Sequence, residues 1–326
     1  MEGEELLVAA ATAAMMAAEY DQVVADTSPL SKATALCPIA IEDGNAWKNR
    51  YTDVLPTEMS RVRLTQPILV PGTTGSLPLV YPSSPTDGPD RYINASWMGW
   101  NRGDYIVTQA PMPCTFEDFW SMVWQEAVHV IVCLTAFSGV SKRNAQPYLP
   151  TDPLAEVGVA PQASHPPLPI TLLYGDVYVT LTSVTNVPAG GYTLRTLSLR
   201  RAGETRTCNH YQYSDWPDGE AVSNPGKLVD LMRAVRQDSA DIPPVARGRS
   251  YLIEPPILVH CSAGLGRSCT FVAAMIATDR RHVGTCCGDI KDIVRLLRTQ
   301  RLGAVQTAAQ YALISVLVDR YLKMEK

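Results

Sequence analysis

The residues best able to do chemistry lie in one short stretch, Ile257 to Phe271, which reads ILVHCSAGLGRSCTF. Its cysteine, Cys261, stands six residues before Arg267, and Ser268 follows the arginine directly. A thiolate is a strong nucleophile, whereas the neutral thiol that dominates in an ordinary cysteine near pH 7 is a weak one. The stretch therefore predicts a nucleophile if its surroundings favour the charged form of the sulfur.

The elements on either side of the cysteine predict such surroundings. The apolar run Ile257 to Val259 is typical of a buried strand, and Arg267 to Asp279, which is rich in alanine and free of proline, favours a helix. The turn between them then aims its backbone N–H groups at one point beside the helix N-terminus, which is an anion site. Its glycines permit unusual dihedrals and close approach. The predicted phosphate-binding loop consists of Cys261, Ser262, Ala263, Gly264, Leu265 and Gly266.

The side chains next to this loop complete the predicted site. Arg267 offers a planar, permanently charged fork that suits two phosphate oxygens at once. Positive charge and the helix N-terminus lower the pKa of a cysteine from its usual value of about 8.5. We expect His260 to orient the turn through its ring nitrogens, and Ser268 to donate a hydrogen bond to the sulfur and ease its later departure. A nucleotide-binding loop is excluded because Gly266 is followed by arginine instead of Lys-Ser or Lys-Thr.

HCSAGLGRS resembles the active-site signature of the cysteine-dependent protein tyrosine phosphatases. Other stretches resemble motifs of this family in the family's order: KNRYTDV (48–54), RYINAS (91–96), YIVTQAP (105–111), FWSMVWQE (119–126), YSDWPDG (213–219) and QTAAQY (306–311). The similarity covers roughly Trp47 to Leu322. It implies hydrolysis of phosphotyrosine in proteins through a phosphocysteine intermediate, with no metal and no cofactor. Phosphotyrosine proteins or peptides are then the partners, and phosphate or vanadate-type anions are ligands of the loop.

The resemblance also assigns the remaining catalytic roles. Asp218, in Trp-Pro-Asp, is implied to protonate the departing phenolate from a loop that closes over the substrate. Gln306 and Gln310 are implied to hold the water that attacks the phosphocysteine, with Asp218 now the base. By itself, a proline turn with a carboxylate is a common surface feature. Gln310 also fits a helix capping box that begins at Thr307, whereas Gln306 lies outside that box.

Two residues of KNRYTDV are implied to select the substrate. In the family, the aromatic residue at the place of Tyr51 forms the wall of a deep slot that only phosphotyrosine reaches across. The carboxylate at the place of Asp53 binds backbone N–H groups of the peptide. Two alternatives remain open, a phosphotyrosine-binding pseudophosphatase and a dual-specificity or phosphoinositide phosphatase. The absence of lysine from SAGLG argues against a phosphoinositide site.

Three features depart from the family pattern. The family has a glutamate after the strand at HVIVCLTAF (129–137), but here Ser138 or Gly139 stands there, and no acid lies between Phe137 and Pro150. We therefore expect Arg267 to be held less rigidly. Cys269 replaces a glycine, and we interpret it as a small buried residue in preference to a disulfide partner of Cys261. Finally, two proline-rich insertions occur near 67–89 and 147–169.

The composition of the whole chain bounds its class. Its 326 residues carry a net charge of −4, which gives no sign of nucleic-acid binding. The eight cysteines lack metal-ligand spacing and predict reduced thiols in the cytoplasm. The apolar run Leu6 to Ala18 follows three glutamates, contains no basic flank and is too short to span a bilayer. We predict a helix that lies on the domain, and neither a signal peptide nor a membrane span.

The predicted fold is a single α/β domain with a central twisted mixed sheet flanked by helices and the phosphate-binding loop between a strand and a helix. We expect an N-terminal helical segment over 1–46 and a catalytic domain over 47–326. The runs Val177 to Thr185 and Tyr192 to Arg201 alternate with period two around a Gly-Gly turn, which predicts a hairpin.

Overall fold

The computed structural model describes residues 2–31, 37–65, 68–69, 79–80, 90–100, 104–138, 141, 143–151, 168–247, 251–279 and 289–324. Its α-helices are α1 (Glu2–Ser31), α2 (Pro38–Ile41), α3 (Phe116–Gln125), α4 (Pro225–Ala240), α5 (Gly266–Ala277), α6 (Ile290–Gln300) and α7 (Ala308–Met324). The strands of the main sheet are β1 (Arg61–Thr65), β4 (Asp90–Met98), β5 (Tyr105–Thr108), β6 (Val130–Cys133), β7 (Ile170–Tyr174), β8 (Val177–Val187), β9 (Tyr192–Arg201), β10 (Glu204–Tyr213) and β13 (Ile257–His260). Two small ladders pair β2 (Ile68–Leu69) with β3 (Leu79–Val80), and β11 (Val245–Arg247) with β12 (Tyr251–Ile253). The predicted α/β class is confirmed.

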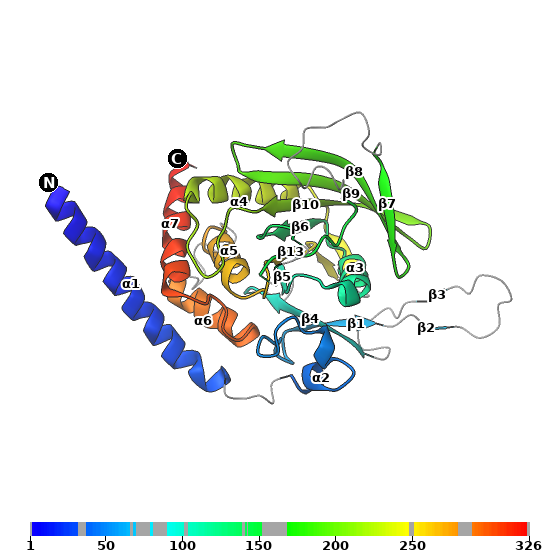
Figure 1. Ribbon diagram of the computed structural model, residues 1–326, viewed down its shortest axis with the longest axis horizontal. Coiled ribbons are helices and arrows are strands. Elements are labelled where there is room, and N and C mark those ends of the chain that lie inside the picture. Colours follow the sequence, from blue (N-terminus) through cyan, green and yellow to red (C-terminus); the bar gives the residue numbers. More distant parts are fainter. Residues whose placement is uncertain are drawn as a thin grey trace.

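The main sheet is mixed, and its parallel part positions the cysteine. The strand order is β1-β4-β5-β13-β6-β10-β9-β8-β7. The four central strands β5, β13, β6 and β10 are parallel, and the outer ones pair antiparallel. Because carboxyl ends of parallel strands meet at one edge, the loops that follow β5, β13, β6 and β10 gather there (Figure 1). Cys261 follows β13, in the middle of that edge.

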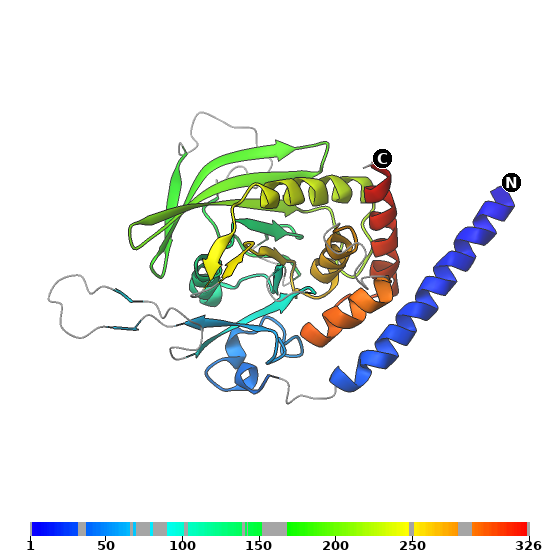
Figure 2. The same ribbon diagram turned by 180° about the vertical axis from the view of Figure 1, so that it is seen from behind.

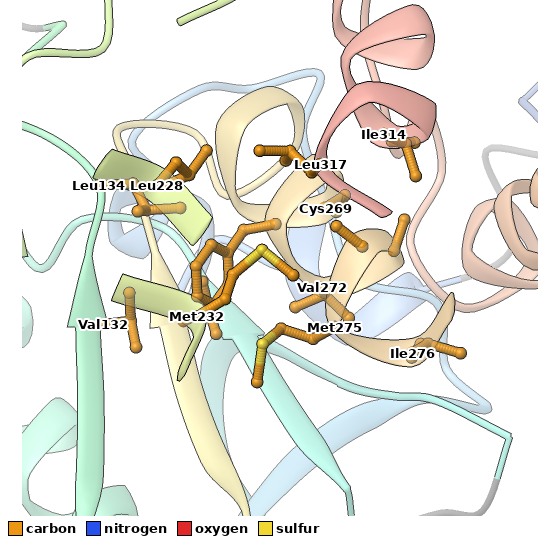
Figure 3. Close-up of a cluster of buried hydrophobic side chains, with 14 of the residues drawn as sticks. Val132, Leu134, Leu228, Met232, Cys269, Val272, Met275, Ile276, Ile314 and Leu317 are labelled. Atoms are coloured by element: carbon orange, nitrogen blue, oxygen red, sulfur yellow. The ribbon is translucent and has the colours of Figure 1, made fainter. Parts of the chain in front are cut away.

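The sheet is buried on both faces, as a parallel core requires. Successive residues of one strand enter different clusters. Val107 and Val259 pack on the face covered by α4, α5 and α7, whereas Ile106 and Leu258 pack on the face covered by α3 (Figures 1 and 2). Figure 3 shows the first cluster, where Met232 of α4, Val272 of α5 and Leu317 of α7 meet the sheet. Because both faces of the central strands are buried, their sequences are continuous apolar runs instead of alternating polar and apolar residues.

The predicted hairpin is confirmed, since β8 and β9 pair antiparallel over most of their length. The strand expected over 129–137 is shorter in the structure, where β6 covers only Val130–Cys133. The two insertions are not simply surface loops. Residues 68–69 and 79–80 form a two-stranded ladder, and Tyr148 and Leu149 at the start of the second insertion are buried in the core. Residues 70–78, 81–89 and 152–167 lie outside the described residues.

Helix α1 lies against α6 and α7 with its C-terminal half, while its N-terminal half extends away from the domain (Figures 1 and 2). The buried residues Tyr20, Val23 and Thr27 recur at helical spacing and define the contacting stripe. Residues 11–15 are exposed. Among the described helices, none combines the length and hydrophobicity needed to span a bilayer.

Candidate active site

The loop from Cys261 to Gly266 connects β13 to α5, as the sequence predicts, and wraps around the sulfur. Cys261 is 2% exposed, and its sulfur accepts a hydrogen bond from the Gly264 N–H at 3.3 Å. Gly264 has a φ of +69°, and a Cβ there would lie 2.3 Å from the carbonyl oxygen of Thr108. Only glycine permits this approach to the neighbouring strand, so the loop depends on Gly264.

The electrostatics of the loop favour the thiolate. Burial by itself raises the pKa of the Cys261 thiol, but the positive charge of Arg267 and hydrogen bonds from Ser268 and Gly264 outweigh it and leave the pKa below its ordinary value. The Ser268 hydroxyl is fully buried and has no hydrogen-bond partner among the described residues, although Ser268 contributes to the lowered pKa of the sulfur. The predicted hydrogen bond from the Ser268 hydroxyl to the sulfur therefore stays a prediction.

Arg267 joins the catalytic loop to the carboxylate of Asp218. Its guanidinium is buried and donates to the Trp216 carbonyl at 3.0 Å and to Asp218 Oδ1 at 2.9 Å. The side chain of Asp218 is 39% exposed, so this ion pair lies at the mouth of the site. The Arg267 Nε atom is buried without a partner among the described residues. A donor left unsatisfied next to an anion loop marks a place for an oxyanion.

One backbone carbonyl contacts Arg267 from the segment in which the resemblance places a glutamate. Among the described residues of the segment after β6, the carbonyl of Arg143 accepts from Arg267 at 3.4 Å. Ser138, one of the two residues at the glutamate's place, donates its N–H to the Ala145 carbonyl, and Gly139 lies outside the described residues. The contact of Arg267 with this segment is therefore a long hydrogen bond to a neutral carbonyl. Its shorter hydrogen bonds go to Trp216 and Asp218 of the loop that carries Asp218.

A buried arginine that the sequence interpretation missed supports the catalytic loop from behind. Arg301 is 0% exposed and donates to the carbonyls of Gly264 at 2.7 Å and Ala263 at 3.1 Å. Its other donors reach Asn94 Oδ1 and Ser96 Oγ of β4. A fully buried guanidinium is rare unless its donors are satisfied. The only signal in the sequence is the polar Asn94 and Ser96 inside an apolar strand.

His260 is also part of a buried network. Its Nδ1 lies 3.1 Å from the Cys261 carbonyl, and its Nε2 lies 2.6 Å from the Tyr148 hydroxyl, which is 2.8 Å from His210 Nε2. Burial lowers the pKa of His260 to about 4, so the ring is neutral at pH 7. The arrangement fits a proton on Nδ1 that is donated to the carbonyl, with Nε2 accepting from Tyr148. This places the ring where it orients the turn.

The segment KNRYTDV lies beside the loop. The Tyr51 hydroxyl is 2.9 Å from Ser262 Oγ, and Asp53 is exposed. The buried Arg50 holds the segment by donating to the carbonyls of Ala110 at 3.0 Å and Pro111 at 3.1 Å. Gln109 ties the same segment through its side-chain amide. Arg50 and Gln109 were not predicted as site residues, although they lie within the motifs KNRYTDV and YIVTQAP.

Gln306 and Gln310 both face the start of α5. A Cβ placed on Gly266 would lie 2.6 Å from Gln306 Oε1 and 2.8 Å from the Gln310 amide. Gln310 is fully buried, and its Nε2 has no partner among the described residues. The capping box is only half formed. Thr307 Oγ1 accepts from the Gln310 N–H at 3.2 Å, but Gln310 Oε1 accepts from the Gln306 N–H instead of from Thr307.

Cys269 lies fully buried in the cluster drawn in Figure 3. Burial raises the pKa of its thiol to about 12, and its Sγ lies 3.8 Å from the Gly264 carbonyl. Both Cys269 and Cys261 are free thiols. This environment agrees with the interpretation of Cys269 as a small buried residue.

Comparison with known proteins agrees with this geometry. The family model of the protein-tyrosine phosphatases matches residues 45–319. The chain is 32% identical over 280 residues to mouse tyrosine-protein phosphatase non-receptor type 5, which covers 85% of this chain and 43% of that protein. It is 34% identical over 279 residues to human tyrosine-protein phosphatase non-receptor type 9, covering 83% and 41% respectively.

A receptor-type relative is also similar, since mouse receptor-type tyrosine-protein phosphatase eta is 32% identical over 287 residues, 86% of this chain and 19% of that protein. The chain therefore spans less than two thirds of the length of these relatives. The match covers the catalytic loop, Asp218, Gln306 and Gln310 together. The chain belongs to the protein-tyrosine phosphatase family.

Proposed function

We propose that this protein hydrolyses phosphotyrosine in proteins or peptides through a phosphocysteine intermediate. The observation that carries the proposal is the buried Cys261 sulfur with a lowered pKa beside Arg267, whose Nε has no partner in the part of the chain that the structure describes. Positioning and charge stabilisation supply most of the catalysis in phosphoryl transfer. The site contains a nucleophile, an anion loop and an acid, which argues for turnover over mere binding.

In the first half-reaction, the Cys261 sulfur attacks phosphorus and the bond from phosphorus to the tyrosyl oxygen breaks. The phosphate takes the place of Asp218 on the Arg267 guanidinium, and the released carboxylate takes up a proton from water, which it then delivers to the departing phenolate. Loop N–H groups and Arg267 neutralise the equatorial oxygens. Tyr51, which is hydrogen-bonded to Ser262 at the loop, flanks the substrate ring, and the exposed Asp53 is available to backbone N–H groups of a peptide.

In the second half-reaction, water attacks the phosphocysteine. Gln306 and Gln310 bind this water, because both amides face Gly266 at the start of α5. The Asp218 carboxylate takes the water proton, and phosphate leaves as the electron pair of the P–S bond returns to sulfur. We also propose that the domain works in a reducing compartment such as the cytoplasm. The six cysteines of the described residues are all free, which supports this placement.

The test is hydrolysis of p-nitrophenyl phosphate, a phosphotyrosine peptide, the matching phosphothreonine peptide and a phosphoinositide. We expect turnover of the first two and loss of both in Cys261→Ser, a drop of at least about 10⁴-fold because the nucleophile is gone. Asp218→Ala should retain the phosphotyrosine peptide without turning it over. Binding without turnover by the intact protein would instead establish a pseudophosphatase, and faster hydrolysis of phosphothreonine or phosphoinositide would overturn the tyrosine selectivity.

A further inference from the structure

Helix α1 reaches the chain immediately before the two water-binding glutamines. The hydroxyl of Tyr20 donates to the carbonyl oxygen of Val305 at 3.1 Å, across 285 residues of sequence. Tyr20 is 9% exposed, and its ring packs against that of Tyr311 with centroids 5.7 Å apart. A buried phenol hydroxyl needs a partner, and here the partner is a backbone group of the active-site region.

Val305 needs to be held in place. Its φ is +60°, an outlying conformation for a β-branched residue, and the side chain is fully buried. Such backbone persists only where the surroundings over-determine it. The Val305 N–H donates to the Leu265 carbonyl of the catalytic loop at 3.2 Å, and its carbonyl accepts from Tyr20. Both the N–H and the carbonyl of Val305 are therefore held by hydrogen bonds.

The Val305 carbonyl and the Gln306 N–H belong to one planar peptide group. That N–H donates to Gln310 Oε1 at 3.1 Å, and this bond holds the two amides together beside Gly266. A rotation of the peptide would move the N–H away from Gln310. The Tyr20 hydroxyl is thus separated from the water-binding amides by a single rigid unit.

A second side chain of α1 acts on the same carbonyl. Thr27 Oγ1 accepts from Arg298 Nε at 2.8 Å, and Arg298 Nη1 donates to the Val305 carbonyl at 3.2 Å. The ion pair of Asp26 with Arg295 binds α1 to α6 in the same region. Two links from α1 therefore converge on one peptide oxygen.

We propose that α1 positions the attacking water through Tyr20, which makes Tyr20 a positioning residue for hydrolysis of the phosphocysteine. This inference rests on the proposed function. In that step the water oxygen attacks phosphorus, the P–S bond breaks with its electron pair returning to Cys261, and Asp218 takes the proton. Formation of the phosphocysteine uses no water, so Tyr20 acts on the second half-reaction alone.

The test separates the two half-reactions of the full chain by rapid quench with less ³²P-labelled phosphotyrosine peptide than enzyme. Tyr20→Phe keeps the packing of the ring and removes only the hydroxyl. We expect the decay of the labelled phosphoenzyme to slow about threefold to tenfold, the factor that corresponds to one buried hydrogen bond. The formation rate should not change. Tyr211→Phe is the matched control, because that phenol is 4% exposed and donates to Asp238 of α4 instead of to the Val305 carbonyl.

Unchanged decay in Tyr20→Phe, or equal slowing of formation and decay, would overturn the inference and leave the proposed function intact. If the intact protein turns over with no trappable phosphoenzyme, or Cys261→Ser keeps its activity, the proposed function itself fails. Should Tyr20→Phe not fold, Thr27→Val carries the same test, since it removes the support of Arg298 while preserving side-chain shape. Slowed decay alone in that variant would support control of the water by α1 through the Val305 carbonyl, and unchanged decay would refute that control.

Discussion

The catalytic loop, Cys261–Gly266, and the acid loop, Trp216–Gly219, lie on either side of Arg267 and are held in different ways. All but Ala263 in the catalytic loop are buried, and its carbonyls are bound by the fully buried Arg301 and by backbone N–H groups. The acid loop buries Trp216, but its Pro217 and Asp218 are exposed. Arg267 and Thr307 connect it to the rest of the site through its carbonyls.

We infer that the catalytic loop is preorganised without substrate, whereas the contacts of the acid loop change when substrate binds. The thiolate needs fixed donors, because a mobile loop would let the thiol take up its proton again. In the proposed mechanism Asp218 has to move, because it occupies the Arg267 guanidinium that phosphate would take over. Without the family's loop glutamate, the orientation of Arg267 depends more heavily on the acid loop.

The largest expected effect comes from breaking the fixed region with Arg301→Met. Four acceptors lose a donor, the carbonyls of Ala263 and Gly264 and the side chains of Asn94 and Ser96, and all but the Ala263 carbonyl belong to buried residues. Each unsatisfied acceptor costs on the order of 1–3 kcal/mol, partly offset by release of a buried charge. We expect the free energy of unfolding in urea to fall by about 3 kcal/mol or more.

The control for this prediction is Arg320→Met on the exposed surface of α7, which should change the free energy of unfolding by less than about 0.5 kcal/mol. A loss in Arg301→Met no larger than in the control would show that the loop does not depend on this arginine.

The next effect concerns pH and the same fixed region. The folded pKa of His260 is about 4, below the value of about 6.5 in the unfolded chain, so the unfolded state binds more protons between these values. The contribution of His260 is fully present above pH 6.5 and is lost as pH falls toward 4. At pH 5 the loss from this group amounts to about 2 kcal/mol.

Urea unfolding at pH 7 and pH 5 measures this loss, and His260→Gln should show a smaller difference between the two pH values than the unaltered protein. His210 is also buried neutral, with its pKa lowered by burial, and therefore adds to the slope in both proteins. Identical slopes would mean that His260 does not titrate as its burial predicts.

The fixed region was also the part that sequence predicted best. Glycine in a strand-to-helix turn, the cysteine and the arginine are local signals, because they all lie within one short stretch of the sequence. The strand alternation likewise predicted the hairpin of β8 and β9. Arg301, Tyr148 and the Arg143 carbonyl could not be found this way, since they reach the site through tertiary contacts from distant segments. Periodicity distinguishes buried from exposed apolar residues, but it does not reveal that an arginine is buried.

The smallest expected effect concerns a hydrogen bond that holds the acid loop. Thr307 Oγ1 donates to the Gly219 carbonyl at 3.1 Å and also accepts from the Gln310 N–H. Thr307→Val removes a hydrogen bond that holds the acid loop over the site, a loss of about 1 kcal/mol or roughly fivefold in rate. Since Asp218 serves the leaving group, hydrolysis of a phosphotyrosine peptide should suffer more than that of p-nitrophenyl phosphate, whose phenolate leaves readily without a proton.

The ratio of kcat/KM for the two substrates measures this directly, and it also separates the acid loop from the water. Misplaced water slows only the shared second half-reaction, which lowers kcat but leaves kcat/KM unchanged for both substrates, whereas a loosened acid loop changes the ratio of the two kcat/KM values. Thr307→Ser, which keeps the hydroxyl, should restore both the ratio and the rate. If Thr307→Val lowers kcat for both substrates and leaves both kcat/KM values unchanged, Thr307 serves the glutamines rather than Asp218.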